Sequence, residues 1–293
     1  MRSVLRVALA LCAFCLSSAL SLAGDPLGDA MAVYNGGDET KAMQMLLPLA
    51  VAGNVKAQDK LAHMYYWGEG TPGNPAEHHK WAALSAAQGD PEGEEDLGSD
   101  YFLGTGVPRD YALALEWMTK AEIGGDDYAP MALSAMYLSG IGAPKDEALG
   151  VKYLREAAAL GEERGLAMLG AYTFYGMFGV KQNSQEAIRW LTLAAEQRNV
   201  GAQSLLSLIY RSGVGTPKNN VEAAKWIILA AAGGCHEAMR QSAFLGLLTS
   251  PSDLKTATHL AAVWDAGHAK HDPHDHRDYR LGICDLGHGD PAI

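Results

Sequence analysis

Apolar residues recur along the chain with the period of an amphipathic helix. Ala57, Leu61 and Tyr65 lie four residues apart, so a helix would present them on one face. Trp117 and Ala121 have the same spacing within a second kind of apolar series. A short stretch with two glycines separates the two kinds of series. The chain is therefore predicted to form pairs of short helices joined by turns.

The helix pair repeats about every 36 residues. The first predicted helix carries leucines at Leu61, Leu97, Leu133, Leu169 and Leu206 and tyrosines at Tyr65, Tyr101, Tyr137 and Tyr210. The second carries the aromatic series Trp81, Trp117, Tyr153, Trp190 and Trp226. A period of this length indicates stacked repeats. The sequence thus predicts an all-α fold, a right-handed α-solenoid of tandem helix-turn-helix repeats.

Each predicted turn contains two glycines, namely Gly68/Gly70, Gly104/Gly106, Gly140/Gly142, Gly176/Gly179 and Gly213/Gly215. The first turn, YYWGEGTPGN, includes G-x-G-x-x-G, the pattern of a dinucleotide-binding turn. That turn needs a preceding strand, but a helix is predicted here, and other copies replace the third glycine with Arg109, Lys145 and Lys218. The glycines are interpreted as helix stops. The residues expected to cap the second helices are Asp110, Asp146 and Asn219 or Asn220.

The combined motif resembles a known repeat family. A-x-x-x-L-G-x-x-Y-x-x-G-x-G, then an acid or amide cap, K/E-A-x-x-W and A-A-x-x-G, is similar to the Sel-one-like repeat, a relative of the tetratricopeptide repeat. The motif is nearly complete in residues 97–125 and 206–234. The resemblance covers about residues 24–236, with a degenerate helix pair to about 267. It implies a superhelix whose first helices line a concave partner-binding groove, and it says almost nothing about activity.

The N-terminal residues have the features of a secretory signal peptide. MRSVLR is followed by an apolar run and by the small-x-small sequence Ser21-Leu22-Ala23. Cleavage is expected after Ala23, with Ala19 as the alternative site and an uncleaved anchor as a further alternative. The expected organisation is a signal peptide (1–23), a divergent N-terminal helix-pair unit (24–56), five repeats (57–236), a degenerate capping helix pair (237–267) and a His/Asp-rich tail (268–293).

Composition and charge narrow the class of partner. Hydrophobic residues make up 48% of the chain and charged residues 19%, a globular composition. Removing the signal peptide leaves 21 of the 23 basic residues against 34 acidic ones, a net charge of −13. Phosphate backbones would be repelled, so nucleic acid is not expected as a partner. A bacterial periplasmic or secreted protein is predicted, with a protein or peptide partner, no cofactor and no membrane span after cleavage.

The predicted groove offers aromatic and apolar side chains among carboxylates. Its candidate residues are Asp59, His63, Tyr66, Trp67, Glu95, Phe102, Leu103, Met131, Phe174 and Tyr175. Such a surface suits an extended peptide or an amphipathic helix with basic flanks. The alternative is that Tyr66, Phe102 and Phe174 pack one repeat on the next. Trp67, Leu103 and Tyr175 are the stronger candidates for exposure.

Other residues suggest chemistry only weakly. The tail residues His268, His271, His274 and His276 could gather a divalent metal, although Pro273 prevents a helix from aligning them. Ser252 begins an S-x-x-K sequence, which also fits the capped start of a helix. Cys235 and Cys284 either form a disulfide or are separate. No catalytic residue is predicted. An adaptor without chemistry is favoured over the alternative, a hydrolase or metal-binding protein using Ser252 or the tail.

Overall fold

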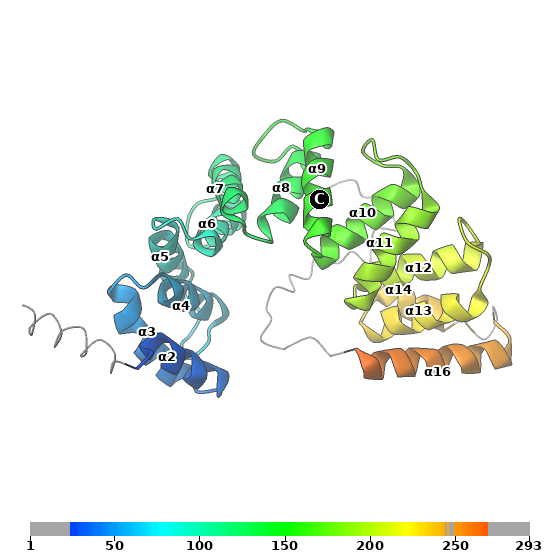
Figure 1. Ribbon diagram of the computed structural model, residues 1–293, viewed down its shortest axis with the longest axis horizontal. Helices are drawn as coiled ribbons and strands as arrows, with labels where there is room; N and C mark the ends of the chain where they lie inside the picture. The colour runs from blue at the N-terminus through cyan, green and yellow to red at the C-terminus, as the bar shows by residue number, and fades with distance from the viewer. Residues whose placement is uncertain (1–23, 244, 246–248, 269–293) are drawn as a thin grey trace, which may run out of the picture. The chain divides into compact units, whose positions relative to one another are not determined.

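Helices make up all the regular structure in the computed structural model, which describes residues 24–243, 245 and 249–268 (Figure 1). The predicted all-α solenoid of helix-turn-helix repeats is thereby confirmed. The chain divides after Asp126 into two units, which are described in turn. Among these described residues, no helix combines the length and apolar character needed to cross a bilayer.

Unit 1 consists of three helix pairs. They are α2 (Pro26–Asn35) with α3 (Glu39–Val51), α4 (Val55–Trp67) with α5 (Pro75–Ala86), and α6 (Pro91–Leu103) with α7 (Tyr111–Gly124). Each helix packs on the one before it and the one after it. Leu46, Leu61 and Met64 are fully buried in a core that Trp81 and Leu97 complete. The apolar series predicted from the sequence are therefore the faces that join neighbouring helices.

Unit 2 contains three more pairs and the C-terminal helices. The pairs are α8 (Ala129–Ser139) with α9 (Glu147–Ala159), α10 (Glu163–Tyr175) with α11 (Ser184–Glu196), and α12 (Val200–Ser212) with α13 (Asn220–Ala232). α14 (His236–Ser242) and α16 (Pro251–Gly267) both pack on α13. Arg198 holds the end of α16, because its guanidinium donates to the carbonyls of Asp265 and His268 and pairs with the Asp265 carboxylate at 2.8 Å.

The helices end at the predicted glycines and begin at the predicted capping residues. The first glycine of each pair, such as Gly68 and Gly104, has φ between +70° and +81° and closes the first helix in the left-handed conformation. At the start of the second helices, the side chains of Asp110, Asp146 and Asn219 accept hydrogen bonds from backbone N–H groups. The predicted caps are confirmed, with Asn219 rather than Asn220 as the last of them.

The second glycine of a pair permits a close approach to the preceding pair. At three positions a Cβ atom would run into the first residue of the preceding second helix, in each case 31 residues earlier. The pairs in contact are Gly70 with Glu39, Gly106 with Pro75, and Gly215 with Ser184. Gly179 lies in the turn with extra residues and has open space instead. The spacing of the stacked pairs therefore depends on glycine at these turns.

Residues one repeat apart also contact each other directly. Arg164 donates a hydrogen bond to the Tyr128 hydroxyl, and Asn199 donates to Glu163, both across 36 residues. The same register holds in unit 1, where Lys56 pairs with Glu92. Equivalent positions of neighbouring first helices therefore lie side by side within each unit.

Replacing Gly106 by alanine should destabilise unit 1 more than replacing Gly89. Both residues have left-handed φ (+71° and +77°), so each substitution costs about 1–2 kcal/mol in backbone strain. Only at Gly106 would the new Cβ also meet rigid backbone, the carbonyl of Pro75, whereas nothing lies within 4 Å at Gly89. Urea unfolding followed by circular dichroism measures the difference. Equal losses for the two variants would show that the close approach contributes nothing.

Candidate functional site

A cavity of about 300 Å³ opens on the first helices of unit 1. Its lining residues are Leu27 and Met31 of α2, Lys56, Asp59, Lys60 and His63 of α4, and Glu92 of α6. Two apolar side chains therefore face five polar or ionisable ones. We call this cavity, together with Trp67 and Leu103 at the ends of α4 and α6, the first-helix surface.

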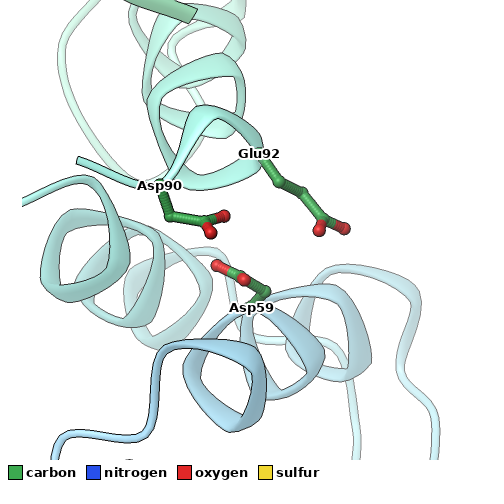
Figure 2. A group of neighbouring side chains, drawn as sticks. All are labelled: Asp59, Asp90 and Glu92. Atoms are coloured by element: carbon green, nitrogen blue, oxygen red, sulfur yellow. The ribbon is translucent and has the colours of Figure 1, made fainter. Parts of the chain in front are cut away.

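Three carboxylates converge at one side of the cavity. Asp59 on α4 faces Asp90 and Glu92 at the start of α6, and their nearest oxygen atoms all lie within 4.8 Å of one another (Figure 2). The Nζ atom of Lys56 lies 3.2 Å from Asp59, 3.1 Å from Asp90 and 3.4 Å from Glu92. One exposed ammonium group thus already takes the central position that a bound cation would need.

The single positive charge of Lys56 does not balance the negative charges of the three carboxylates. Burial, with the negative charges of Asp90 and Glu92, raises the pKa of Asp59 to about 7, although Ser85 and Lys56 oppose the shift. Burial by itself would lower the pKa of Lys56, but the hydrogen bond to Asp90 and the other two carboxylates raise it. Asp59 therefore takes up a proton near neutral pH, while Lys56 keeps its charge.

A second ionic network borders the cavity around Glu69. This buried carboxylate accepts a 2.8 Å hydrogen bond from the Tyr34 hydroxyl and lies 3.2 Å from His63 Nδ1. Lys60 Nζ lies 3.9 Å from the same carboxylate and 3.4 Å from the centre of the Tyr34 ring. The network fixes α2 against α4, so this wall of the cavity is held in place by polar contacts.

Apolar side chains extend the surface beyond the cavity. Trp67 is 38% exposed and Leu103 is 47% exposed. The Trp67 ring lies 6.3 Å from the His63 ring and 4.9 Å from the Tyr66 ring, which continues the surface from the cavity edge along α4. The predicted exposure of Trp67 and Leu103 is confirmed. Phe102 is half-buried, and its ring lies 5.4 Å from the ring of Tyr111 in the same helix pair.

Two of the three candidate residues in unit 2 are covered by neighbouring helices. Met131 and Phe174 are buried in the hydrophobic core, so neither side chain offers an exposed contact; for Phe174, packing was the stated alternative. The physical reason is that first helices also pack sideways on their neighbours, and this buries apolar residues on more than one face. Tyr175 is 53% exposed, as predicted. A smaller pocket of about 100 Å³ is lined by α12, α13, α14 and the residues that follow α14.

A buried hydrogen-bonded group behind the first-helix surface was not predicted. His78 on α5 is 3% exposed and Asp100 on α6 is 1% exposed. His78 Nε2 lies 3.1 Å from Asp100 Oδ1 and its Nδ1 lies 3.0 Å from the Ala62 carbonyl oxygen of α4. His79 Nδ1 approaches the other oxygen of Asp100 at 2.8 Å. Sequence spacing could not reveal the group because its members lie on helices of different repeats.

Glu95, the remaining candidate in unit 1, is half-buried and accepts a 2.7 Å hydrogen bond from Ser99. Burial raises its pKa to about 7. It lies on the same helix as Glu92, within the acidic first turns of α6. Glu95 therefore contributes to the electrostatics behind the cavity wall.

The residues proposed for other chemistry lie towards the C-terminus. Ser252 is exposed in the first turn of α16, and its hydroxyl lies 2.9 Å from that of Ser250, the residue that caps the helix.

Cys235 is buried, and its sulfur atom lies 3.7 Å from the Ser204 hydroxyl oxygen. Its suggested partner Cys284 lies outside the described residues, and so do the tail residues His271, His274 and His276. The possible disulfide and the metal site remain predictions. The remaining tail candidate, His268, stacks on Trp264 with ring centres 3.9 Å apart.

The sequence matches a family model, Sel1 repeat, over residues 55–90, 91–126, 129–162, 164–199 and 200–235. The chain belongs to the Sel1 repeat family. Sel1 repeat proteins generally act as scaffolds for protein interaction, and the family is typically non-catalytic. The five matched repeats are α4–α5 to α12–α13, the helix pairs whose turns contain the paired glycines.

Solved structures agree with this assignment. A Sel1 repeat protein from Oxalobacter formigenes is 25% identical, with a TM-score of 0.70 over 81% of this chain and 99% of its own. A protective antigen present in uropathogenic Escherichia coli strains, which displays an SLR fold, is 28% identical with a TM-score of 0.67 over 82% of this chain. The chain spans about half (52%) of the length of that E. coli protein. None of the curated proteins compared with the sequence matched it.

Replacing Lys56 by methionine should make the stability of unit 1 more dependent on pH. Without the ammonium group the three carboxylates repel one another, so the melting temperature should fall at about pH 8. The folded pKa of Asp59, about 7, lies above the ordinary value of 3.8, so the folded state binds the proton more tightly. Stability is therefore lost as the pH rises through that range and regained on acidification.

The defect of Lys56→Met should shrink at about pH 5, where Asp59 is protonated. Lys80→Met is the matched control, because Lys80 is similarly exposed and its ion pair within the described part of the chain is with one carboxylate, Glu77, beside the Trp81 ring. Thermal unfolding at both pH values measures the effect. An identical pH profile for the two variants would contradict the shared-cation interpretation.

Proposed function

We propose that this Sel1 repeat protein is a non-catalytic scaffold that binds a peptide segment of a protein partner on the first-helix surface of unit 1. The observation that carries the proposal is the open cavity of about 300 Å³, in which charged and apolar side chains converge beside the exposed Trp67. Cavities that combine apolar walls with a few placed polar groups are typical binding sites.

The chemistry of the surface indicates the kind of segment that fits. Trp67 and Leu103 offer apolar contact area, and tryptophan is enriched among the residues that dominate binding energy. Asp59 and Glu92 offer carboxylates to which a basic flank of the segment can pair. A net charge of −13 after signal removal favours such a partner over nucleic acid. An amphipathic helix or an extended peptide with basic flanks is the proposed ligand.

The scaffold proposal includes the absence of catalysis. The family is typically non-catalytic, and the S-x-x-K serine Ser252 is an exposed residue beside the helix cap. Both observations favour a binding role over the hydrolase alternative.

Polar substitutions at Trp67 and Leu103 together should abolish partner capture. The purified mature chain would be crosslinked in an extract of the organism's own cell envelope, and the captured proteins would be identified and quantified. A discrete partner bound by the wild type should be lost from Trp67→Ser/Leu103→Ser, because the apolar contact area is removed while the carboxylates remain.

Leu84→Ser is the matched control. Leu84 is 43% exposed, similar to the two target residues, but it lies on the second helix α5. The control should capture the same partner as the wild type. If the double variant, shown to be folded by circular dichroism, retains the partner, the first-helix surface is not the binding site.

Export through residues 1–23 is part of the proposal. The basic start, the apolar run and the small residues at Ser21 and Ala23 support a cleaved signal peptide and a periplasmic or secreted location. Fractionation and N-terminal sequencing of the native protein should therefore find it outside the cytoplasm and beginning at Gly24. A full-length chain in the cytoplasmic fraction would contradict export.

A further inference from the structure

His78 connects three helices behind the first-helix surface. It belongs to α5, its Nδ1 contacts the Ala62 carbonyl of α4, and its Nε2 contacts the Asp100 carboxylate of α6. α4 supplies four of the residues that line the cavity, and α6 supplies Glu92. The single imidazole therefore links two of the three helices that line the cavity.

The two contacts of His78 favour an extra proton on the ring. Nδ1 is hydrogen-bonded to the Ala62 carbonyl oxygen, and Nε2 lies 3.1 Å from the Asp100 carboxylate as an ion-pair partner. Both oxygen atoms are acceptors, so both contacts are attractive only when each ring nitrogen carries a proton. A neutral imidazole has only one N–H group. In one neutral tautomer a nitrogen lone pair would face Asp100 at 3.1 Å, and in the other it would face the Ala62 oxygen at 3.0 Å. Either tautomer converts one attractive link into a repulsive contact.

The surrounding groups favour the charged form of the ring. On α6, Asp100, Asp96 and Glu95 stabilise the charged ring, although burial holds the pKa of Asp96 well above its ordinary value and raises that of Glu95 to about 7. On α5, His79 shares Asp100. The α4 groups Lys56, Asp59, Lys60 and His63 pair within the two cavity networks, and the nearest α4 ring is Tyr66 at 4.9 Å. Burial opposes the charge, but the Asp100 carboxylate at 3.1 Å and the neighbouring carboxylates raise the pKa of His78 to about 8.

We propose that His78 is a proton-dependent latch: its imidazolium ties α4 to α6, and loss of the proton loosens the first-helix surface. A buried group is suited to this role because water cannot replace the ion pair with Asp100 that deprotonation removes. Moving the proton across to Asp100 would leave the same number of protons in the pair, so the latch opens only when a proton leaves it. The consequence for partner binding rests on the proposed function, whereas the latch itself does not.

The direction of the pH effect follows from linkage. The pKa of His78 is raised above the ordinary 6.5, so the stabilisation is complete below about pH 6.5 and is lost as the pH rises through about 8. A shift of this size corresponds to an increase in local opening on the order of ten-fold. The surface should therefore be held in place in mildly acidic and neutral solution and loosen in alkaline solution.

Hydrogen exchange of the mature chain tests the latch without any partner. Exchange of the α4 and α6 amides would be compared at about pH 6 and pH 8.5, after correction for the intrinsic pH dependence of exchange. The wild type should show about ten-fold more opening at the higher pH. His78→Gln, which cannot titrate at this position, should show a clearly smaller increase, namely the part contributed by Asp59 and Glu95, whose pKa values lie at about 7. His79→Gln should retain the full increase.

Nitrogen chemical shifts of the His78 ring provide a readout that does not depend on the variants folding. In the wild type both ring nitrogens should carry protons at about pH 7. A neutral ring at that pH, or an increase in opening that is as large in folded His78→Gln as in the wild type, would overturn the proposal. Failure to capture a partner would instead count only against the proposed function, because neither latch measurement involves a partner.

Discussion

A pair of helices of about a dozen residues cannot enclose its own apolar face, so each pair in this protein must bury that face against a neighbour. Leu61 and Leu133 are fully buried because adjacent helices cover them within their own units. Close stacking then limits what the turns can contain. The carbonyl of Pro75 lies where a side chain at residue 106 would begin, and only glycine leaves room for it. The paired glycines are therefore a consequence of the contact between repeats.

The same stacking brings polar side chains of different repeats together. Lys56 and Glu92 occupy the same position in successive repeats and form an ion pair, while Asp59 and Asp90 complete the group around Lys56. Partial removal from water moves the pKa of Asp59 into the neutral range. The first-helix surface is therefore supported partly by groups that exchange protons near neutral pH. Its shape is accordingly more sensitive to pH than that of a surface resting on apolar contacts alone.

The helices, their glycine ends and their caps could be predicted because each depends on residues close in sequence. Asp110 caps a helix that begins at the next residue, and Gly104 ends a helix at the preceding one. The exposure of Trp67 and Tyr175 also followed from their position in the repeat. The periodicity of a first helix does not distinguish a face turned to solvent from a face packed on a neighbouring helix, so only the packing decided that Met131 and Phe174 are buried.

The sequence alone determined the repeat period, the helix pairs, the glycine ends and caps of the helices, and the family. All of these depend on short residue spacings that recur along the chain. Only the tertiary structure decided which side chains meet across helices. His78 and Asp100 are 22 residues apart on helices of different repeats, and no local pattern relates them. Their contact, the cavity and the shifted pKa values depend on the distances between packed helices. Those distances are set by how the side chains fill the space between repeats.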